Sequence, residues 1–512
     1  MKKYTKYLQA DFPAAIVVFL VALPLCLGIA LGSKAPLFSG IIAGVVGGIV
    51  IGLLSGSSLS VSGPAAGLIA IVASAILKLP SFETFLLAVV LAGFMQLLLG
   101  FAKAGILGDF VPNAVIKGML AAIGIILILK QIPHLIGYDA DFEGDETFIQ
   151  PDNQNTFSEL LNAINIESWG PMIIGILSLL ILVLFDSKTF KSNKVLKQVP
   201  GALVAVITGI LLNLFFNTQH STLVISPEHM VNLPIANNTD EFLKFFSFPD
   251  IKQISNPMVW RTALTIAIVA SLETLLSLEA VDKMDPFKRV SPTNRELKAQ
   301  GVGNMISGLL GGLPLTSVIV RSSANINAGA KSKMSAVLHG VLLLVAILLI
   351  PQTLNLIPLS ALAAILIYTG YKLAKISLFT EFFEKGWNQF IPFVATIIAI
   401  LFSDLLVGIL LGIIVSLLFM VYSNFRSSIS VVIDNNNYLF RLRKDVTFLN
   451  KPRLKMKLEH LPENAYVLID ATQADFIDND VIDVINEFKQ HAGLKNIEVE
   501  IKKNNNKMQQ FL

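Results

Sequence analysis

The stretch GGLPLTSVIVRSSANINAGAK, at residues 311–331, differs from the segments around it and indicates the fold class of the chain. A glycine pair and a proline come first, a short apolar run follows, and Arg321 then introduces a series of serines and asparagines. The stretch lies among long apolar segments, yet it is too polar and too interrupted to be an ordinary membrane span. Irregular backbone at membrane depth is tolerated only where it is buried in protein or lines a cavity. The pattern therefore predicts a half-helix that begins inside the membrane and does not face lipid.

The surroundings of this stretch are typical of a membrane protein. The 512 residues are 54% hydrophobic and 15% charged, with a mean hydropathy of +0.68, whereas a soluble domain usually carries about 25% charge. Apolar runs of about 20 residues, each long enough to cross a bilayer, recur between residues 13 and 424. We predict an all-α polytopic membrane protein with 14 transmembrane segments. The single cysteine, Cys26, falls within the first span, so neither disulfides nor cysteine-ligated metal sites are expected.

The loops alternate in charge. Loops 186–198, 281–298 and 372–385 are rich in Lys and Arg, whereas loop 130–169 is acidic. Basic loops tend to stay on the cytoplasmic side of the membrane. An even number of spans then places both termini in the cytoplasm, and the count of spans agrees with the distribution of charge. We expect a multi-pass protein of the bacterial inner membrane.

A second interrupted segment, SVSGPAAGLIAIVASAI at 60–76, matches the first in its place along the chain. Each is the third span of a seven-span half, and the halves cover about residues 8–216 and 258–425. Because seven is odd, the halves must lie in opposite orientations, which makes a 7+7 inverted repeat. Paired Gly- or Pro-interrupted spans at matching places are the best sequence pointer to a transporter site. The transmembrane domain as a whole is expected to cover residues 1–425.

Two half-helices that begin at mid-membrane would form an anion site. The first N–H groups of a helix have no acceptor within it, and the helix dipole places partial positive charge there. Two such ends facing each other bind an anion without a buried lysine or arginine. The predicted substrate-binding residues are Pro64, Ala65 and Ala66 in one half-helix start, and Ser317, Val318 and Ile319 in the other, with Arg321 one turn further on. Arg321 either attracts the anion or extends toward the cytoplasmic side.

Glu273 is the candidate for cation coupling. It lies in IAIVASLETLLSLEA (266–280), the eighth span, and an ionisable group within a span is a functional candidate because its burial is costly. A glutamate can carry a proton at this depth because desolvation disfavours its charged form. With the hydroxyl of Ser277 and carbonyl oxygens it could instead hold Na⁺. No other metal, no cofactor and no nucleic-acid partner is predicted.

Several stretches resemble the SulP family, the sulfate permeases and their anion-transporting relatives. They are LQADFPAAIVVFLVALPLCLGIALG (8–32), FVPNAVIKGMLAAIG (110–124) and SANINAGAK (323–331). The resemblance covers about residues 8–425 and implies a mobile core domain, a gate domain, elevator-type movement and a homodimer. It also implies that Glu273 occupies the acidic position of the family's eighth span. Bicarbonate-transporting members carry Asp there with Thr one turn later, where this chain has Glu273 and Ser277.

Residues 430–512 differ in composition and predict a small cytoplasmic α/β domain. Strand-like YLFRLR (438–443) and AYVLID (465–470) precede a helical pattern at VIDVINEFKQHA (481–492). The order of elements is similar to that of the STAS domain, which ends many members of the family. Related soluble STAS proteins carry an Asp followed by a phosphorylatable serine, whereas Asn479 follows Asp478 here. A serine-phosphorylation switch of that kind is therefore not expected.

Together these features predict a secondary active transporter of a small inorganic anion, bicarbonate or sulfate, coupled to H⁺ or Na⁺. A dicarboxylate carrier and an anion channel remain alternatives, as does a membrane anchor that carries a regulatory domain. A nucleobase carrier of the same fold usually needs carboxylates in spans eight and ten, and span ten here offers Arg321 instead. An enzyme is not predicted, because no catalytic constellation stands out.

Overall fold

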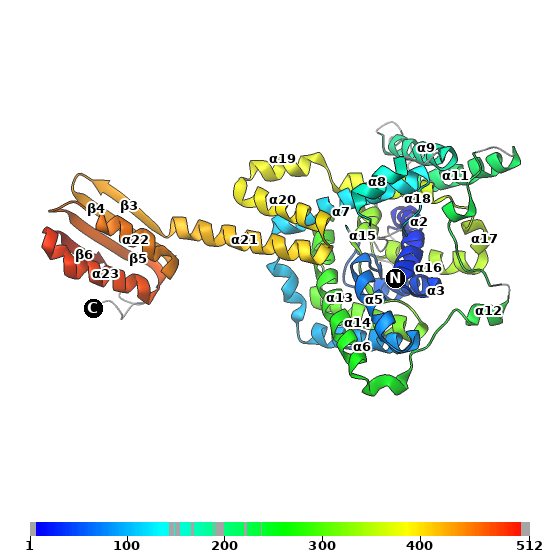
Figure 1. The fold of residues 1–512 in the computed structure, drawn as a ribbon, viewed down its shortest axis with the longest axis horizontal. Helices are drawn as coiled ribbons and strands as arrows, with labels where there is room; N and C mark the ends of the chain where they lie inside the picture. Colours follow the sequence, from blue (N-terminus) through cyan, green and yellow to red (C-terminus); the bar gives the residue numbers. More distant parts are fainter. Residues whose placement is uncertain are drawn as a thin grey trace. The chain divides into compact units, whose positions relative to one another are not determined.

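The computed structural model describes residues 7–142, 148, 154–164, 168–187, 190, 199–219, 223–236 and 238–502. The chain divides into two compact units, Met1–Ile413 and Ile414–Leu512, which are described separately below (Figure 1). Most of the basic loop at 186–198 and residues 503–512 lie outside the described part of the chain.

The first unit is a bundle of long apolar helices. Eight helices in the described part are long and apolar enough to cross a membrane, and four shorter apolar helices accompany them. The polytopic all-α fold is thereby confirmed, while the number of 14 spans stays a prediction. The helices are α2 (Leu8–Gly32), α3 (Leu37–Val46), α4 (Gly52–Leu54), α5 (Ile69–Lys78), α6 (Phe82–Phe101), α7 (Asn113–Ile136), α8 (Thr156–Ile164), α9 (Trp169–Asp186), α11 (Gly201–Thr218), α12 (Thr239–Leu243), α13 (Pro257–Met284), α14 (Thr293–Leu310), α15 (Ile319–Asn327), α16 (Met334–Leu349), α17 (Pro351–Leu354), α18 (Leu359–Leu373), α19 (Ile376–Glu384), α20 (Trp387–Phe402) and α21 (Leu405–Ser427).

The helices pack in two groups. In the group that we call the core group, α14 lies along α6, α13 contacts α6, and α2 contacts α3, α15 and α16. In the gate group, α7 packs against α18 and α20, and α9 packs against α11 and α18. Glycines allow the closest crossings: a Cβ on Gly93 or Gly301 would lie 2.6–2.7 Å from backbone atoms of the facing helix, and the Gly124–Gly370 pair is equally tight. Small residues at such crossings let the helix backbones approach each other.

Both interrupted segments contain a short strand followed by a short helix. Strand β1 (Ser62–Pro64) leads through a 3₁₀ turn (Ala66–Leu68) into α5, and β2 (Leu315–Ser317) leads into α15. The strands pair antiparallel, with Ser62 opposite Ser317 and Pro64 opposite Leu315. The half-helices predicted from the Gly- and Pro-interrupted pattern are thus present, and a two-stranded sheet joins them.

Gly311 explains how the GGLP sequence prepares this arrangement. Its φ of 92° is in the left-handed region that favours glycine, and it ends α14 there. The N–H of Gly312 then donates to Ser307 O at 2.7 Å, as is common at helix C-termini. The two glycines therefore end the preceding helix before β2 begins.

The second unit contains residues 414–427 at the end of α21 and a four-stranded sheet with two helices. Its strands are β3 (Ile429–Asp434), β4 (Asn437–Val446), β5 (Tyr466–Ile477) and β6 (Glu498–Lys502), in the order β3-β4-β5-β6. The first pair is antiparallel and the other two are parallel. Helices α22 (Lys451–Glu459) and α23 (Asn479–Ala492) contribute Leu454 and Ile485 to a core with Phe440 and Val467. The predicted small α/β domain is confirmed.

Candidate functional site

The two half-helix starts meet at the β1–β2 sheet inside the core group. Besides the strand pairing, the N–H of Val318 donates to Val61 O at 3.0 Å, and the hydroxyls of Ser60 and Ser317 lie 2.6 Å apart. The predicted residues Ala65, Ala66, Val318 and Ile319 therefore lie where the strands give way to helices.

Each start leaves backbone N–H groups without an acceptor in its own helix. The first intrahelical bonds run from Leu68 N to Ala65 O and from Ser322 N to Val318 O. The N–H groups just before these donors therefore form the positive ends of the two dipoles. Pro64 differs from the prediction: it lies in β1, opposite Leu315, rather than in the first helical turn. It shapes the strand and has no N–H to offer.

Arg321 is fully buried and does not extend toward solvent, which overturns one of its two predicted roles. Its Nη2 lies 3.3 Å from Cys26 Sγ, while its Nε and Nη1 have no hydrogen-bond partner among the described residues. The guanidinium packs against β1, since a Cβ on Gly63 would lie 1.9 Å from Nη1. Buried, unpaired donors of this kind are rare and costly.

Helix α13 contacts both half-helices through adjacent residues. The carboxyl group of Glu273, a side chain that is 6% exposed, lies beside the start of α5, because a Cβ on Gly67 would be 3.2–3.4 Å from it. Thr274 Oγ1 accepts a hydrogen bond from Ser317 N at 3.2 Å. Ser277 lies one turn further along α13 and is also buried. The structure thus brings Glu273 close to the start of α5, and adds Thr274, which the sequence did not single out.

Two amide side chains of α14 form hydrogen bonds with polar groups of β1 and β2. Asn304 accepts from Leu315 N at 2.6 Å through Oδ1 and donates through Nδ2 to Gln96 Oε1 at 2.6 Å. Gln300 Nε2 donates to Ser62 Oγ at 2.7 Å. The buried backbone of a membrane strand needs such partners. Neither Gln300 nor Asn304 stands out in the sequence, although polar residues at i and i+4 of a glycine-rich span are a usable signal.

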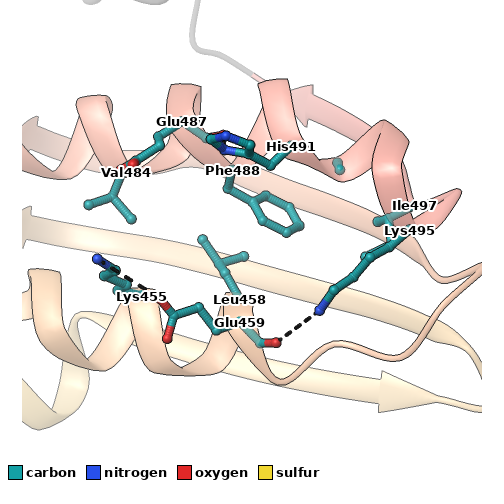
Figure 2. Close-up of a pocket in the computed structure, with 10 residues that line it drawn as sticks. Lys455, Leu458, Glu459, Val484, Glu487, Phe488, His491, Lys495 and Ile497 are labelled. Atoms are coloured by element: carbon teal, nitrogen blue, oxygen red, sulfur yellow. Dashed lines mark hydrogen bonds and ion pairs between the residues drawn. The ribbon is translucent and has the colours of Figure 1, made fainter.

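A separate cavity of about 340 Å³ lies in the second unit, between α22 and α23. Figure 2 shows its apolar floor beneath a rim that carries both signs of charge. Lys495 Nζ donates to Glu459 O at 3.4 Å, and Lys455 lies 3.9 Å from the carboxylate of Glu459. Because the rim balances its own charges, it shows no preference for an anion.

A family model described as the sulfate permease family matches residues 8–396 of this chain. The chain belongs to the sulfate permease family. A second model, for the STAS domain, matches residues 428–511, so the second unit is a STAS domain. In it Asp478 caps α23, because its side chain accepts from Asp480 N at 3.1 Å. The predicted membership is confirmed, and this is a family of transporters rather than enzymes.

Two relatives of this chain carry the names of sulfate and bicarbonate transporters. The putative sulfate transporter YvdB of Bacillus subtilis is 30% identical over 417 residues, which is 81% of this chain and 73% of that one. The bicarbonate transporter BicA of Picosynechococcus is 24% identical over 424 residues, covering 81% and 70%.

Two solved structures share the fold. The transmembrane domain of a cyanobacterial BicA matches 80% of this chain and 97% of its own, with a TM-score of 0.55 and 21% identity. Murine Slc26a9 in the inward-facing state matches 97% and 85%, with a TM-score of 0.66 and 14% identity. This member of the sulfate permease family therefore has the fold of these multi-pass membrane proteins.

Proposed function

We propose that this chain is a secondary active transporter of bicarbonate or sulfate, and that the anion binds between the starts of α5 and α15. The observation that carries the proposal is the meeting of two positive helix ends at the β1–β2 sheet, beside a fully buried Arg321 with two unpaired nitrogens. Backbone N–H groups near Ala66 and Ile319, with the guanidinium, supply the donors that an oxyanion needs. Ser317 contributes its hydroxyl.

The choice between bicarbonate and sulfate stays open in this proposal. The name of YvdB refers to sulfate and that of BicA to bicarbonate, and N–H groups with a guanidinium bind either oxyanion. A dicarboxylate would use the same donors. A nucleobase is disfavoured, because α15 presents a guanidinium where a base would need a carboxylate.

Glu273 couples transport to a cation in this proposal. Its carboxyl group lies at the start of α5, beside Gly67, and Ser277 lies one turn away on α13. A proton bound by this carboxylate, or Na⁺ held by it with Ser277, would offset one negative charge in the core. The cation therefore favours movement of the loaded anion site across the low-dielectric interior.

The movement that we propose carries the core group as one body past the gate group. The β1–β2 sheet joins both half-helices, so neither can move without the other. A cavity of about 170 Å³ separates Pro13 and Ala324 of the core group from Leu182 and Ile365 of the gate group. This cavity is the expected route from the cytoplasm in a bacterial cell membrane, with both termini on that side. A homodimer is the expected assembly.

Uptake by the purified chain in liposomes tests the function. Labelled sulfate, bicarbonate and a dicarboxylate are supplied with a pH gradient or a Na⁺ gradient, each imposed alone. We expect one inorganic anion to accumulate under one of the gradients. A carrier is excluded if none of the three enters under either gradient, and a channel is indicated if entry follows only the anion's own gradient.

The Glu273→Gln variant tests the coupling separately. It keeps the shape of the side chain but cannot ionise, so we expect gradient-driven accumulation to fall at least about tenfold, the effect of losing about 1.4 kcal/mol. Exchange of labelled for unlabelled anion should persist. The matched control is Glu279→Gln, since Glu279 pairs with Lys283 at the end of the same helix. Unchanged accumulation by Glu273→Gln would show that the carboxylate serves packing alone.

A further inference from the structure

A basic cavity of about 240 Å³ lies at the end of the core group that the loop charges predict to be cytoplasmic. It is lined by loop 55–58 before β1, by the loop between α13 and α14, by Arg295 in the first turn of α14, and by residues 331–333 after α15. The lining includes four cationic side chains and no carboxylate; the cations are Arg289, Arg295, Lys331 and Lys333. The hydroxyl groups of Ser57 and Ser58 are also at its wall.

Two of the four cations have structural partners. Arg289 donates to Asp285 Oδ2 at 2.6 Å and to Lys331 O at 2.8 Å. Lys333 Nζ donates to Leu53 O at 2.6 Å, which satisfies a carbonyl at the end of α4. These contacts hold the loops in place and pre-form the cavity.

The other two cations keep unused donors. Arg295 Nε donates to Leu54 O at 2.9 Å. Its two terminal nitrogens have no polar partner among the described residues. In the described part of the chain the Lys331 ammonium has no polar partner, and it lies 5.9 Å from the centre of the Tyr7 ring.

The carboxylates behind the cavity wall are already occupied. Asp11 accepts from the N–H groups of Lys331 and Ser332 at 2.7 and 3.0 Å. Glu296 is bonded to the Ser55 hydroxyl and accepts from Gln300 at 3.0 Å. These bonds hold both carboxylates behind the wall, and the charged side chains that line the cavity itself are all cationic.

We propose that this cavity binds the phosphate group of an anionic ligand, either the headgroup of an acidic phospholipid or free phosphate. Arginine and lysine donors together with serine hydroxyls suit phosphate oxygens. Large apolar side chains flank the cavity and are exposed: Leu53, Phe287 and Val290 are 51%, 53% and 88% accessible. Basic pockets beside apolar surface at the cytoplasmic membrane face are typical sites for lipid headgroups.

The cavity is linked to the β1–β2 sheet by a short chain of serines. Ser60 N donates to Ser57 Oγ at 3.2 Å, and the Ser60 hydroxyl lies 2.6 Å from that of Ser317. Loop 55–58 leads into the first half-helix segment, and loop 331–333 follows the second. A phosphate bound here would hold together the segment that enters the first half-helix and the one that leaves the second.

Thermal unfolding of the purified full-length chain tests the binding without any transport assay. The probes are dioctanoyl phosphatidic acid, inorganic phosphate and dioctanoyl phosphatidylcholine. We expect phosphatidic acid to raise Tm in a saturable way, and phosphatidylcholine, whose phosphate carries a choline, to leave it unchanged. If inorganic phosphate by itself raises Tm as much as phosphatidic acid does, the ligand is free phosphate. If only phosphatidic acid raises Tm, the ligand is a lipid headgroup.

Variants then locate the site. Replacing Arg295 and Lys331 by Gln removes the unpaired donors, so half-saturation should need about tenfold or more ligand. Lys298→Gln is the matched control, because Lys298 follows Arg295 on α14 but contacts Phe101, outside the cavity. If the double variant fails to fold, Lys331→Gln alone serves, since the Lys331 side chain has no polar partner to lose. The proposal is overturned if neither phosphatidic acid nor inorganic phosphate shifts Tm, or if the variants respond like the native chain.

Discussion

The starts of α5 and α15 have the same backbone design but opposite side-chain charge. A carboxylate, Glu273 from α13, lies beside the start of α5, whereas a guanidinium, Arg321, belongs to the first turn of α15. Negative charge at a helix N-terminus is stabilising and positive charge there is not. Glu273 is therefore in a place that suits the fold, while Arg321 is in a place that opposes it. This difference supports the proposal that Arg321 binds the anion, since its position does not stabilise the helix.

The largest effect that we expect comes from Arg321→Met. Loss of two charge-assisted hydrogen bonds to the anion, at about 1.5–3 kcal/mol each, should reduce uptake by about 100-fold or more. Replacing an unpaired buried charge by an apolar side chain should raise the unfolding free energy by about 1–4 kcal/mol. Thermal unfolding and liposome uptake measure the two effects. Arg261→Met, at an exposed position on α13, is the control. If Arg321→Met is less stable than the native chain and still transports, the contrast between the two half-helix starts is wrong.

Two glycine substitutions should separate the two starts. A Cβ on Gly63 would lie 1.9 Å from Arg321 Nη1, so Gly63→Ala must displace the guanidinium and should weaken anion uptake about tenfold. A Cβ on Gly67 would lie 3.2–3.4 Å from the Glu273 carboxyl group, which needs a shift of only a few tenths of an ångström. Gly67→Ala should change the cation dependence a few-fold and leave the anion KM unchanged. Equal effects on the anion KM would show that the two starts are not specialised.

A smaller effect is expected from Thr274→Val, which removes the acceptor for Ser317 N. A buried N–H without a partner costs about 1–3 kcal/mol, so Tm should fall and uptake should fall with it. Thr265→Val is the matched control, because the Thr265 hydroxyl bonds only to Arg261 O of its own helix. If Thr274→Val unfolds like the control, α13 does not position β2 through this contact.

The smallest effect is a pH dependence of stability that arises away from both half-helices. Asp139, just beyond α7, lies between His134 and His229, with His229 Nδ1 2.5 Å from its Oδ2. The hydrogen bond to Asp139 raises the pKa of His229. Burial raises the pKa of Asp139, but the hydrogen bonds from both histidines outweigh burial and leave that pKa below its usual value.

These directions fix the sign. The contribution of His229 is complete below the usual histidine pKa and is lost as pH rises through its raised pKa, so Tm should fall as the solution becomes alkaline. His229→Gln should flatten this dependence and leave the pH profile of uptake unchanged. A Tm profile that His229→Gln leaves intact would place the titrating group elsewhere.

The sequence was informative where the pattern itself demands a structure. Gly and Pro within apolar spans predicted the half-helices. An ionisable side chain within a span made Glu273 the candidate for cation coupling. Thr274, Gln300 and Asn304 were missed because their roles depend on which backbone N–H groups and hydroxyl groups of β1 and β2 the strand pairing brings within reach. The burial of Arg321 was undecided for a similar reason, since only the fold places Gly63 and Cys26 against it. Pro64 was misplaced by two residues, because a three-residue strand precedes the helix.

The β1–β2 pairing also sets the order in which the molecule can be completed during its synthesis. Ser62 and Ser317 are 317 − 62 = 255 residues apart. At about 5–20 residues per second, the ribosome needs on the order of ten to fifty seconds to supply the second strand after the first. During that interval the polar edge of β1 lacks its partner strand as well as Gln300 of α14. The proposed anion site therefore cannot form before Ser317 has been synthesised, and α16, α18 and α20 are still to follow at that point.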